Sequence, residues 1–314
     1  MRKVTMSGAV AVLALVLAGC SGVTGDSESD ASRPSSTAPP TAAASTAPTP
    51  ARSPSLSGAA LRLAGTRDKL QTAQTYKGHS EAQTDGVLTS THDFQVRLGD
   101  RAALRQVTTV FPAAYEGLGL PNRPTEPQVS ESLQLPGGVV YSSNSPLMIQ
   151  LSNGKHWSKT TLDLPTSTSS TPEDFSAQLA LLQKAGDIGE VGKETIDGIA
   201  TTHYNGTISL LLLHDNAAAD FGLSEKQYEA LRAFWTDQGF DNARIDLWIG
   251  QDSLPVRQIT VTTAKSGGVP KTTKVTTRYW DWGKPIDDTP PPADDVDEIS
   301  PGGLPGALPT RNPS

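Results

Sequence analysis

Histidine is the residue type in this chain best suited to metal or acid–base chemistry, and its spacing supports neither. The five histidines are His79, His92, His156, His203 and His214. A zinc site brings three or four ligands together, and these histidines lack the HExxH and His-x-His spacings. A single cysteine excludes a Cys-based zinc site, an iron–sulfur cluster and a disulfide framework. We therefore predict surface histidines, no metal and no other cofactor.

One short motif has the residue types of a nucleophile and its base. Ser152-Asn153-Gly154-Lys155 matches the S-x-x-K pattern of penicillin-recognising enzymes, in which the serine begins a helix. Here the motif spans a predicted hairpin turn, and the companion Ser-Asp-Asn and Lys-Thr-Gly elements do not occur, so we interpret it as a chance match. No Walker loop, Gly-x-Ser-x-Gly elbow or Gly-x-Gly-x-x-Gly occurs either. The aspartates Asp287, Asp288, Asp294, Asp295 and Asp297 are interpreted as a solvated acidic edge. The sequence thus predicts a protein that is not an enzyme.

The only cysteine has the context of an acylation site. Arg2 and Lys3 precede an apolar run, which ends in Leu17-Ala18-Gly19-Cys20. A charged start, a short apolar core and small residues at the cleavage site are typical of a secretory signal peptide. With its cysteine, the segment resembles the bacterial lipoprotein signal, in which this cysteine is lipidated and becomes the mature N-terminus. The alternative is an ordinary signal peptide with a cysteine placed there by chance.

Composition divides the chain into four parts. Residues 1–19 are the predicted lipoprotein signal, and 20–56 are the lipidated cysteine and a tether rich in Ser, Thr, Ala and Pro. Such a segment buries too little apolar surface to offset its ordering entropy, so we predict disorder there and in the Pro- and Gly-rich tail at 299–314. Residues 57–298 form the predicted domain. The net charge of −7 argues against nucleic-acid binding.

The predicted domain begins with a helix near Ser57 and continues in short alternating segments. Strands are predicted at 75–84, 87–98, 103–110, 128–135, 139–142, 147–151, 155–161, 187–195, 199–207, 243–250, 256–263 and 271–281. Further helices are predicted at 172–186 and 224–238, and a leucine run occupies 210–213. A long antiparallel meander with helices at three points predicts an α+β fold, built on a single curved sheet with helices against one face.

Several of these segments resemble a known family. The stretch Val191–Gly198, followed by His203-Tyr204-Asn205-Gly206, resembles a hairpin of the LppX/LprG lipoproteins of actinobacteria, and the stretches 247–257 and 279–296 are similar to the next hairpin and the usual end. That family is similar in fold to the LolA and LolB lipoprotein carriers. The resemblance implies a half-barrel with helices packed on its concave face and an apolar cavity for acyl chains. Segments 111–127 and 166–171 look like insertions, so ligand identity does not transfer.

Apolar side chains remain as the candidates for function. The candidate cavity walls are Leu179, Leu182, Leu211, Leu212, Leu231, Phe234, Ile245, Leu247 and Ile249. The alternative is that they form a plain core. We predict an extracytoplasmic protein held by lipidated Cys20 on the outer leaflet of the cytoplasmic membrane, where it binds or carries an acyl lipid or lipoglycan. The other hypothesis is an envelope sensor or regulatory module of the same fold, with a protein partner.

Overall fold

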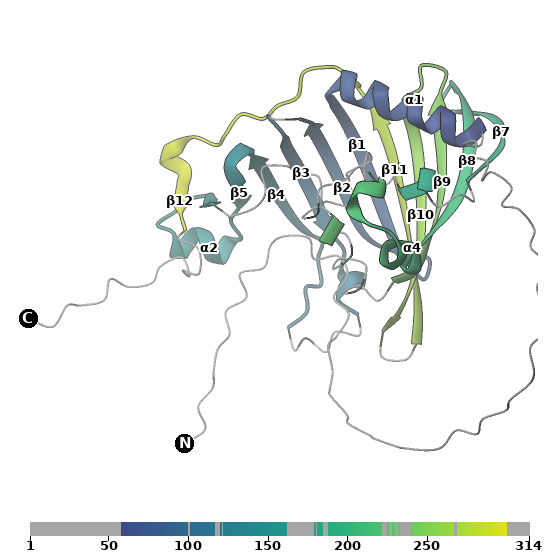
Figure 1. Ribbon diagram of the computed structural model, residues 1–314. Coiled ribbons are helices and arrows are strands. Elements are labelled where there is room, and N and C mark those ends of the chain that lie inside the picture. The colour runs from purple at the N-terminus through teal and green to yellow at the C-terminus, as the bar shows by residue number, and fades with distance from the viewer. Residues whose placement is uncertain are drawn as a thin grey trace, which may run out of the picture.

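The computed structural model describes a domain made mostly of strands (Figure 1). The described residues are 58–99, 101–116, 120, 122–161, 179, 181–184, 188–221, 225, 228–229, 232, 236, 240–266 and 269–299. The strands are β1 Thr75–Thr84, β2 Val87–Arg97, β3 Ala103–Val110, β4 Gln128–Leu135, β5 Val139–Ser143, β6 Trp157–Thr161, β7 Gly189–Ile196, β8 Ile199–Ser209, β9 Phe240–Gly250, β10 Pro255–Ser266, β11 Val269–Trp280 and β12 Val296–Glu298. The α-helices are α1 Gly58–Ala73, α2 Pro146–Leu151 and α4 Leu210–Asp215, and the 3₁₀ turns are η1 Pro112–Tyr115, η2 Pro136–Gly138, η3 Ala218–Phe221 and η4 Ala293–Asp295.

All twelve strands belong to one sheet, in the order β12-β6-β5-β4-β3-β2-β1-β11-β10-β9-β8-β7. Neighbouring strands are antiparallel except β12 and β6, which are parallel. The sheet is curved and unclosed, because β12 and β7 lie at opposite ends of the order (Figure 1). The predicted fold class, a single curved antiparallel sheet with helices against one face, is confirmed.

Tight turns set the register of two hairpins. Asp197 and Gly198 have φ values of 50° and 82°, and Asp85 and Gly86 have 50° and 84°. Two successive residues with positive φ match the right-handed twist of the flanking strands, and Asp-Gly is a favoured pair for this turn. The predicted turn at Asp197-Gly198 is therefore confirmed. In each hairpin it places the strand residues opposite fixed partners.

One predicted strand, 147–151, is wrong, because this segment is helix α2. The Ser145 hydroxyl oxygen accepts a hydrogen bond from the backbone N–H of Met148, and Pro146 occupies the first turn. A serine cap followed by proline is a helix-start signal that outweighs a short apolar run. Asn153 and Gly154, both with positive φ, end this helix instead of joining two strands.

The core lies between helix α1 and one face of the sheet, which we call the inner face. Figure 1 shows α1 lying across the strands at the end of the sheet that carries β7 to β11. Leu63 and Leu70 of α1 are fully buried and belong to one cluster with Tyr76 of β1, Leu104 of β3 and Leu247 of β9. The cluster joins strands that are distant in sequence, so burial on this face holds the two halves of the chain together.

Residues 281–298, the C-terminal strap, run from β11 to β6 past the ends of the strands that lie between them (Figure 1). Asp287 contacts Arg105 at 2.7 Å and Asp288 contacts Arg97 at 2.5 Å, while the strap ends in β12 beside β6. The interpretation of these aspartates as a solvated edge is therefore wrong for Asp288, whose side chain is 28% exposed, whereas Asp287 pairs with Arg105 but stays exposed to solvent. Their basic partners lie nearly two hundred residues earlier in the chain, and only the pairing of strands brings them near.

The strap should lose part of its attachment in acid. The pKa of Asp287 is lowered, first by hydrogen bonds with Thr289 and then by Arg105. Hydrogen bonds from the backbone and side chain of His156 lower the pKa of Asp295. A carboxyl group with a lowered folded-state pKa contributes stability above its unfolded value of 3.8, and this contribution disappears as pH falls through the folded value.

We therefore expect the unfolding free energy of the wild type to fall between about pH 5 and about pH 2, and this slope to be smaller in Asp287→Asn and Asp295→Asn. Chemical unfolding at several pH values measures it. Asp294→Asn is the matched control from the same strap. The hydrogen bond from the Lys155 ammonium goes to the backbone carbonyl oxygen of Asp294, so the substitution leaves this contact in place. An unchanged slope in both variants would contradict the prediction.

Candidate functional site

Strand register sorts the sheet side chains onto two faces of different chemistry. Tyr76 lies opposite Val96, and Gly78 lies opposite both Phe94 and Tyr279, so these residues share the inner face. Followed through the same pairings across β1–β6 and β8–β11, the paired residues on this face include one charged side chain, that of Lys271 near the start of β11. The outer face holds the other charges. The inner face of these ten strands is therefore the one suited to an uncharged ligand.

Part of the inner face is apolar. Its buried side chains, together with those of α1, form the core cluster, and on the strands they are Tyr76, Phe94, Val96, Leu104, Tyr204, Ile208, Ala243, Ile245, Leu247, Ile249 and Tyr279. Aromatic rings are concentrated near its middle: Tyr76 stacks on Trp282 with centroids 4.6 Å apart and meets Phe94 edge-to-face at 6.2 Å. The sequence prediction missed this aromatic group, although strand alternation places Tyr76 and Phe94 on one face.

The predicted wall residues fall into three groups. Leu179, Leu182, Ile245, Leu247 and Ile249 are buried together in the core cluster. Leu211, on α4, is 70% exposed and is not in that cluster. Leu231, Phe234, Cys20 and the side chain of Leu212 lie outside the described residues. The structure thus brings five of the nine candidates together, and their role as walls of a lipid cavity stays a prediction.

The rest of the inner face is lined by hydroxyl and amide groups. Ser80 and Thr277 share a hydrogen bond of 2.8 Å, and the Tyr279 hydroxyl donates to the Gln258 amide oxygen at 3.2 Å. His92 lies between Ser90 and Thr108, with ring nitrogens 3.2 Å and 3.0 Å from their hydroxyl oxygens. Burial, with a smaller contribution from His79, lowers the pKa of His92. This imidazole is therefore neutral at neutral pH and adds no charge to this part of the inner face.

Two histidines of the outer face, His79 and His203, each have two acidic neighbours, and His203 is the more buried of the two. His203 stacks on Trp248 with centroids 4.3 Å apart, and its ring nitrogens lie 3.2 Å from Glu194 and 3.0 Å from Asp246. Trp248 donates from its indole nitrogen to the same Glu194 carboxylate at 2.6 Å. Each group is satisfied by its neighbours, which is the arrangement of a structural cross-strand cluster. Among the described residues, no group of three His, Cys, Asp or Glu could hold a metal ion.

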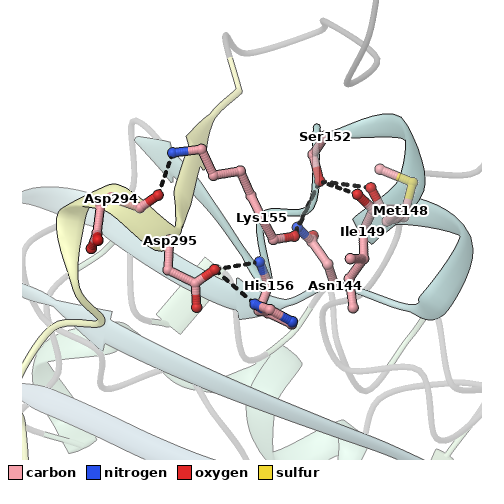
Figure 2. A network of polar contacts seen from close by, with 8 residues as sticks. All are labelled: Asn144, Met148, Ile149, Ser152, Lys155, His156, Asp294 and Asp295. Atoms are coloured by element: carbon pink, nitrogen blue, oxygen red, sulfur yellow. Dashed lines mark hydrogen bonds and ion pairs between the residues drawn. The ribbon is translucent and has the colours of Figure 1, made fainter.

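The S-x-x-K motif is held in a polar network of another kind (Figure 2). The Ser152 hydroxyl donates to the backbone carbonyl of Met148 at 2.7 Å and closes the end of α2. The Lys155 ammonium donates to the carbonyl oxygen of Asp294 at 2.5 Å, and His156 donates from its backbone to the Asp295 carboxylate at 2.9 Å. Figure 2 shows the lysine amine directed at the strap, away from the serine. The motif therefore fastens the strap to β6 and forms no nucleophile–base pair.

A hollow of about 170 Å³ lies mainly on the outer face, beside the C-terminal strap. Its lining includes Lys77, Asp93, Gln95, Arg105 and Trp280. These charged residues lie on the opposite face from the predicted walls, so the hollow is separate from the apolar part of the inner face. No helix within the described parts of the chain is long and apolar enough to cross a membrane.

The chain shares limited similarity with known sequences. No protein-family model matches it. A Streptomyces griseus protein, described as an uncharacterized 31.2 kDa protein in the rplA–rplJ intergenic region, is 25% identical over 169 residues. The match covers 50% of this chain and 52% of that protein, so the chain spans about half the length of its curated relative.

Two mycobacterial lipoproteins are similar in structure. LprF from Mycobacterium bovis is 14% identical with a TM-score of 0.42, and the match covers 74% of this chain and 96% of LprF. The Mycobacterium tuberculosis lipoprotein LppX is 16% identical with a TM-score of 0.42, over 73% of this chain and 97% of LppX. The recognition made from the sequence motifs is confirmed as a similarity: this chain is similar to lipoproteins of the LppX type from actinobacteria.

Proposed function

We propose that this protein is an extracytoplasmic lipoprotein, anchored to the outer leaflet of the cytoplasmic membrane through Cys20, that binds or carries an acyl lipid without catalysis. The observation that supports the proposal is the sorting of charge between the two faces of the sheet. A domain needs only part of one sheet face for its core, but here the inner face of ten strands has a single charged side chain among its paired residues, Lys271 near the start of β11. Such a broad surface with little charge, apolar in part, suits hydrocarbon.

Binding would be driven by removal of acyl chains from water. Each Å² of apolar surface buried contributes about 25 cal/mol, so a chain that buries a few hundred Å² gains several kcal/mol. The buried wall candidates Leu182, Ile245 and Leu247 lie on the inner-face side of the sheet, where the acyl chain would bind. Acylation of Cys20 would hold the domain at the membrane, near the source of its lipid. Such an anchor is stable when the cysteine carries more than one acyl chain.

Purification from native membranes tests the proposal. Mass spectrometry of the extracted protein should find a lipid in stoichiometric amount, and the purified protein should move a fluorescent acyl lipid between vesicles. Cys20→Ala should abolish palmitate labelling and membrane association while lipid binding persists, which separates the anchor from the binding domain. Absence of both bound lipid and transfer would refute lipid binding. A single stoichiometric membrane-protein partner in place of lipid would favour the sensor hypothesis.

A further inference from the structure

The polar part of the inner face is concentrated on strands β3 to β6. Register places Gln106, Ser132, Ser142 and Ser158 in one row across these four strands. Gln134 lies in the adjoining row, between Leu104 and Val140. A face that only packed on a core would favour aliphatic side chains here, as β8 and β9 do. The row instead offers hydroxyl and amide groups.

Ser132 is the residue of this row that points to a ligand. It is 7% exposed, and its hydroxyl has no hydrogen-bond partner. Other serines of the inner face have partners: Ser158, two strands away in the same row, donates to the Asn144 amide oxygen at 2.5 Å, and Ser80 on β1 pairs with Thr277. Buried polar groups in native proteins nearly always have a partner, and an unmet hydroxyl is unfavourable. The Ser132 hydroxyl is therefore free for a donor or acceptor from outside the chain.

Charge restricts what that ligand can be. Arg97 and Arg105 of the neighbouring strands lie on the outer face and are paired with Asp288 and Asp287. Among the described residues of the helices, Arg62 interacts with Tyr204, Lys184 pairs with Asp220, and Arg232 lies over the ring of Tyr228. Arg67 and Lys69 belong to α1, which lies over the other end of the sheet, at β7 to β11 (Figure 1). Tyr204 and Tyr228 belong to the core cluster, whereas Ser132 does not. A phosphate at Ser132 would therefore have to be buried without a cation from the surrounding strands, which is costly.

We propose that the polar row on β3–β6 binds the uncharged, hydroxyl-bearing head group of an amphiphile and selects against anionic phospholipids. The inference rests on the proposed function and extends it, because acyl chains would lie on the apolar part of the same face. Hydroxyl and amide side chains exchange hydrogen bonds with sugar or glycerol hydroxyls without any charge to neutralise. The net charge of −7 further disfavours an anionic ligand.

The test compares two lipids with identical acyl chains on the full-length protein. Dioleoyl monogalactosyl diacylglycerol should bind at least about tenfold more tightly than dioleoyl phosphatidylglycerol, because only the second brings a charge. Competition against a fluorescent acyl probe measures both affinities. Equal or tighter binding of phosphatidylglycerol would overturn the head-group proposal while leaving lipid binding intact. If neither lipid competes, both proposals fail.

A variant at Ser132 locates the head group. Ser132→Ala should weaken binding of the galactolipid by about three- to tenfold, which corresponds to the loss of one hydrogen bond. The affinity for phosphatidylglycerol should stay unchanged. Thr109→Val is the control, because Thr109 lies opposite Val129 on the outer face. The melting temperature of Ser132→Ala should not fall, because its hydroxyl has no partner to lose. Unchanged galactolipid affinity in a folded Ser132→Ala protein would overturn the placement.

Discussion

Leu63→Ala is expected to lower the free energy of unfolding by about 2–5 kcal/mol, the range for truncating a fully buried leucine. Leu63 is 0% exposed and joins the core cluster from the middle of helix α1. The truncation removes apolar burial and leaves a cavity against a sheet that cannot collapse to fill it. Urea unfolding followed by circular dichroism measures the loss.

Leu61 supplies the matched control for this prediction. It lies two residues away on the same helix and is 60% exposed, so Leu61→Ala should change stability by no more than about 0.5 kcal/mol. Besides Leu63 and Leu70, the only large apolar residue of helix α1 is the exposed Leu61, so the stability of the helix depends on packing those two leucines against the sheet. Leu63→Ala should therefore also speed trypsin cleavage at Arg67 and Lys69. Equal stability of the two variants would contradict the burial of Leu63.

Gly78→Ala is expected to destabilise the protein by about 1–3 kcal/mol through overpacking. A Cβ atom at this position would lie 2.2 Å from the Phe94 ring and 2.9 Å from the backbone carbonyl of Arg278. The ring can turn only within an aromatic group that also contains Tyr76 and Tyr279. The carbonyl is part of the β11 backbone and cannot move without disturbing the pairing with β1. Thermal unfolding measures the effect.

A second substitution separates a steric clash from a general effect of alanine. In Phe94→Leu the ring that meets Gly78 is removed, so adding Gly78→Ala should cost less there than in the wild type. Gly65→Ala is the opposite control, because no atom lies within 4 Å of a Cβ built on this helical glycine. It should stabilise the protein by up to about 1 kcal/mol through helix propensity. A Gly78→Ala protein as stable as the wild type would contradict the close contact.

Local patterns in the sequence were sufficient to predict the elements that depend on a single strand or a single turn. Alternation predicted β1, β2, β3 and β4 within one or two residues, and Asp197-Gly198 predicted its hairpin. Where two local signals competed, the prediction failed: the apolar run at 147–151 matched a strand, but the Ser145 cap and Pro146 start a helix. The short strand β12 carries too few residues for any pattern and forms only because β6 lies beside it.

Which candidate wall residues lie together could not be predicted from any single segment of the sequence. The sequence offered nine apolar candidates, and the structure buries five of them together because β9 pairs between β8 and β10 and faces helix α1. Whether Leu211 is buried could not be read from the leucine run, since one helical turn exposes some positions of any run.

The amino-acid sequence by itself determined the class of fold, the hairpin turns and the resemblance to LppX-type lipoproteins, because strand alternation and turn chemistry act over a few residues. Only the tertiary structure decided which residues face each other. The scarcity of charge on the inner face, the free hydroxyl of Ser132 and the pairing of Asp287 with Arg105 all follow from strand register between distant segments. Register depends on many weak pairings satisfied together, and so it is a property of the whole sheet.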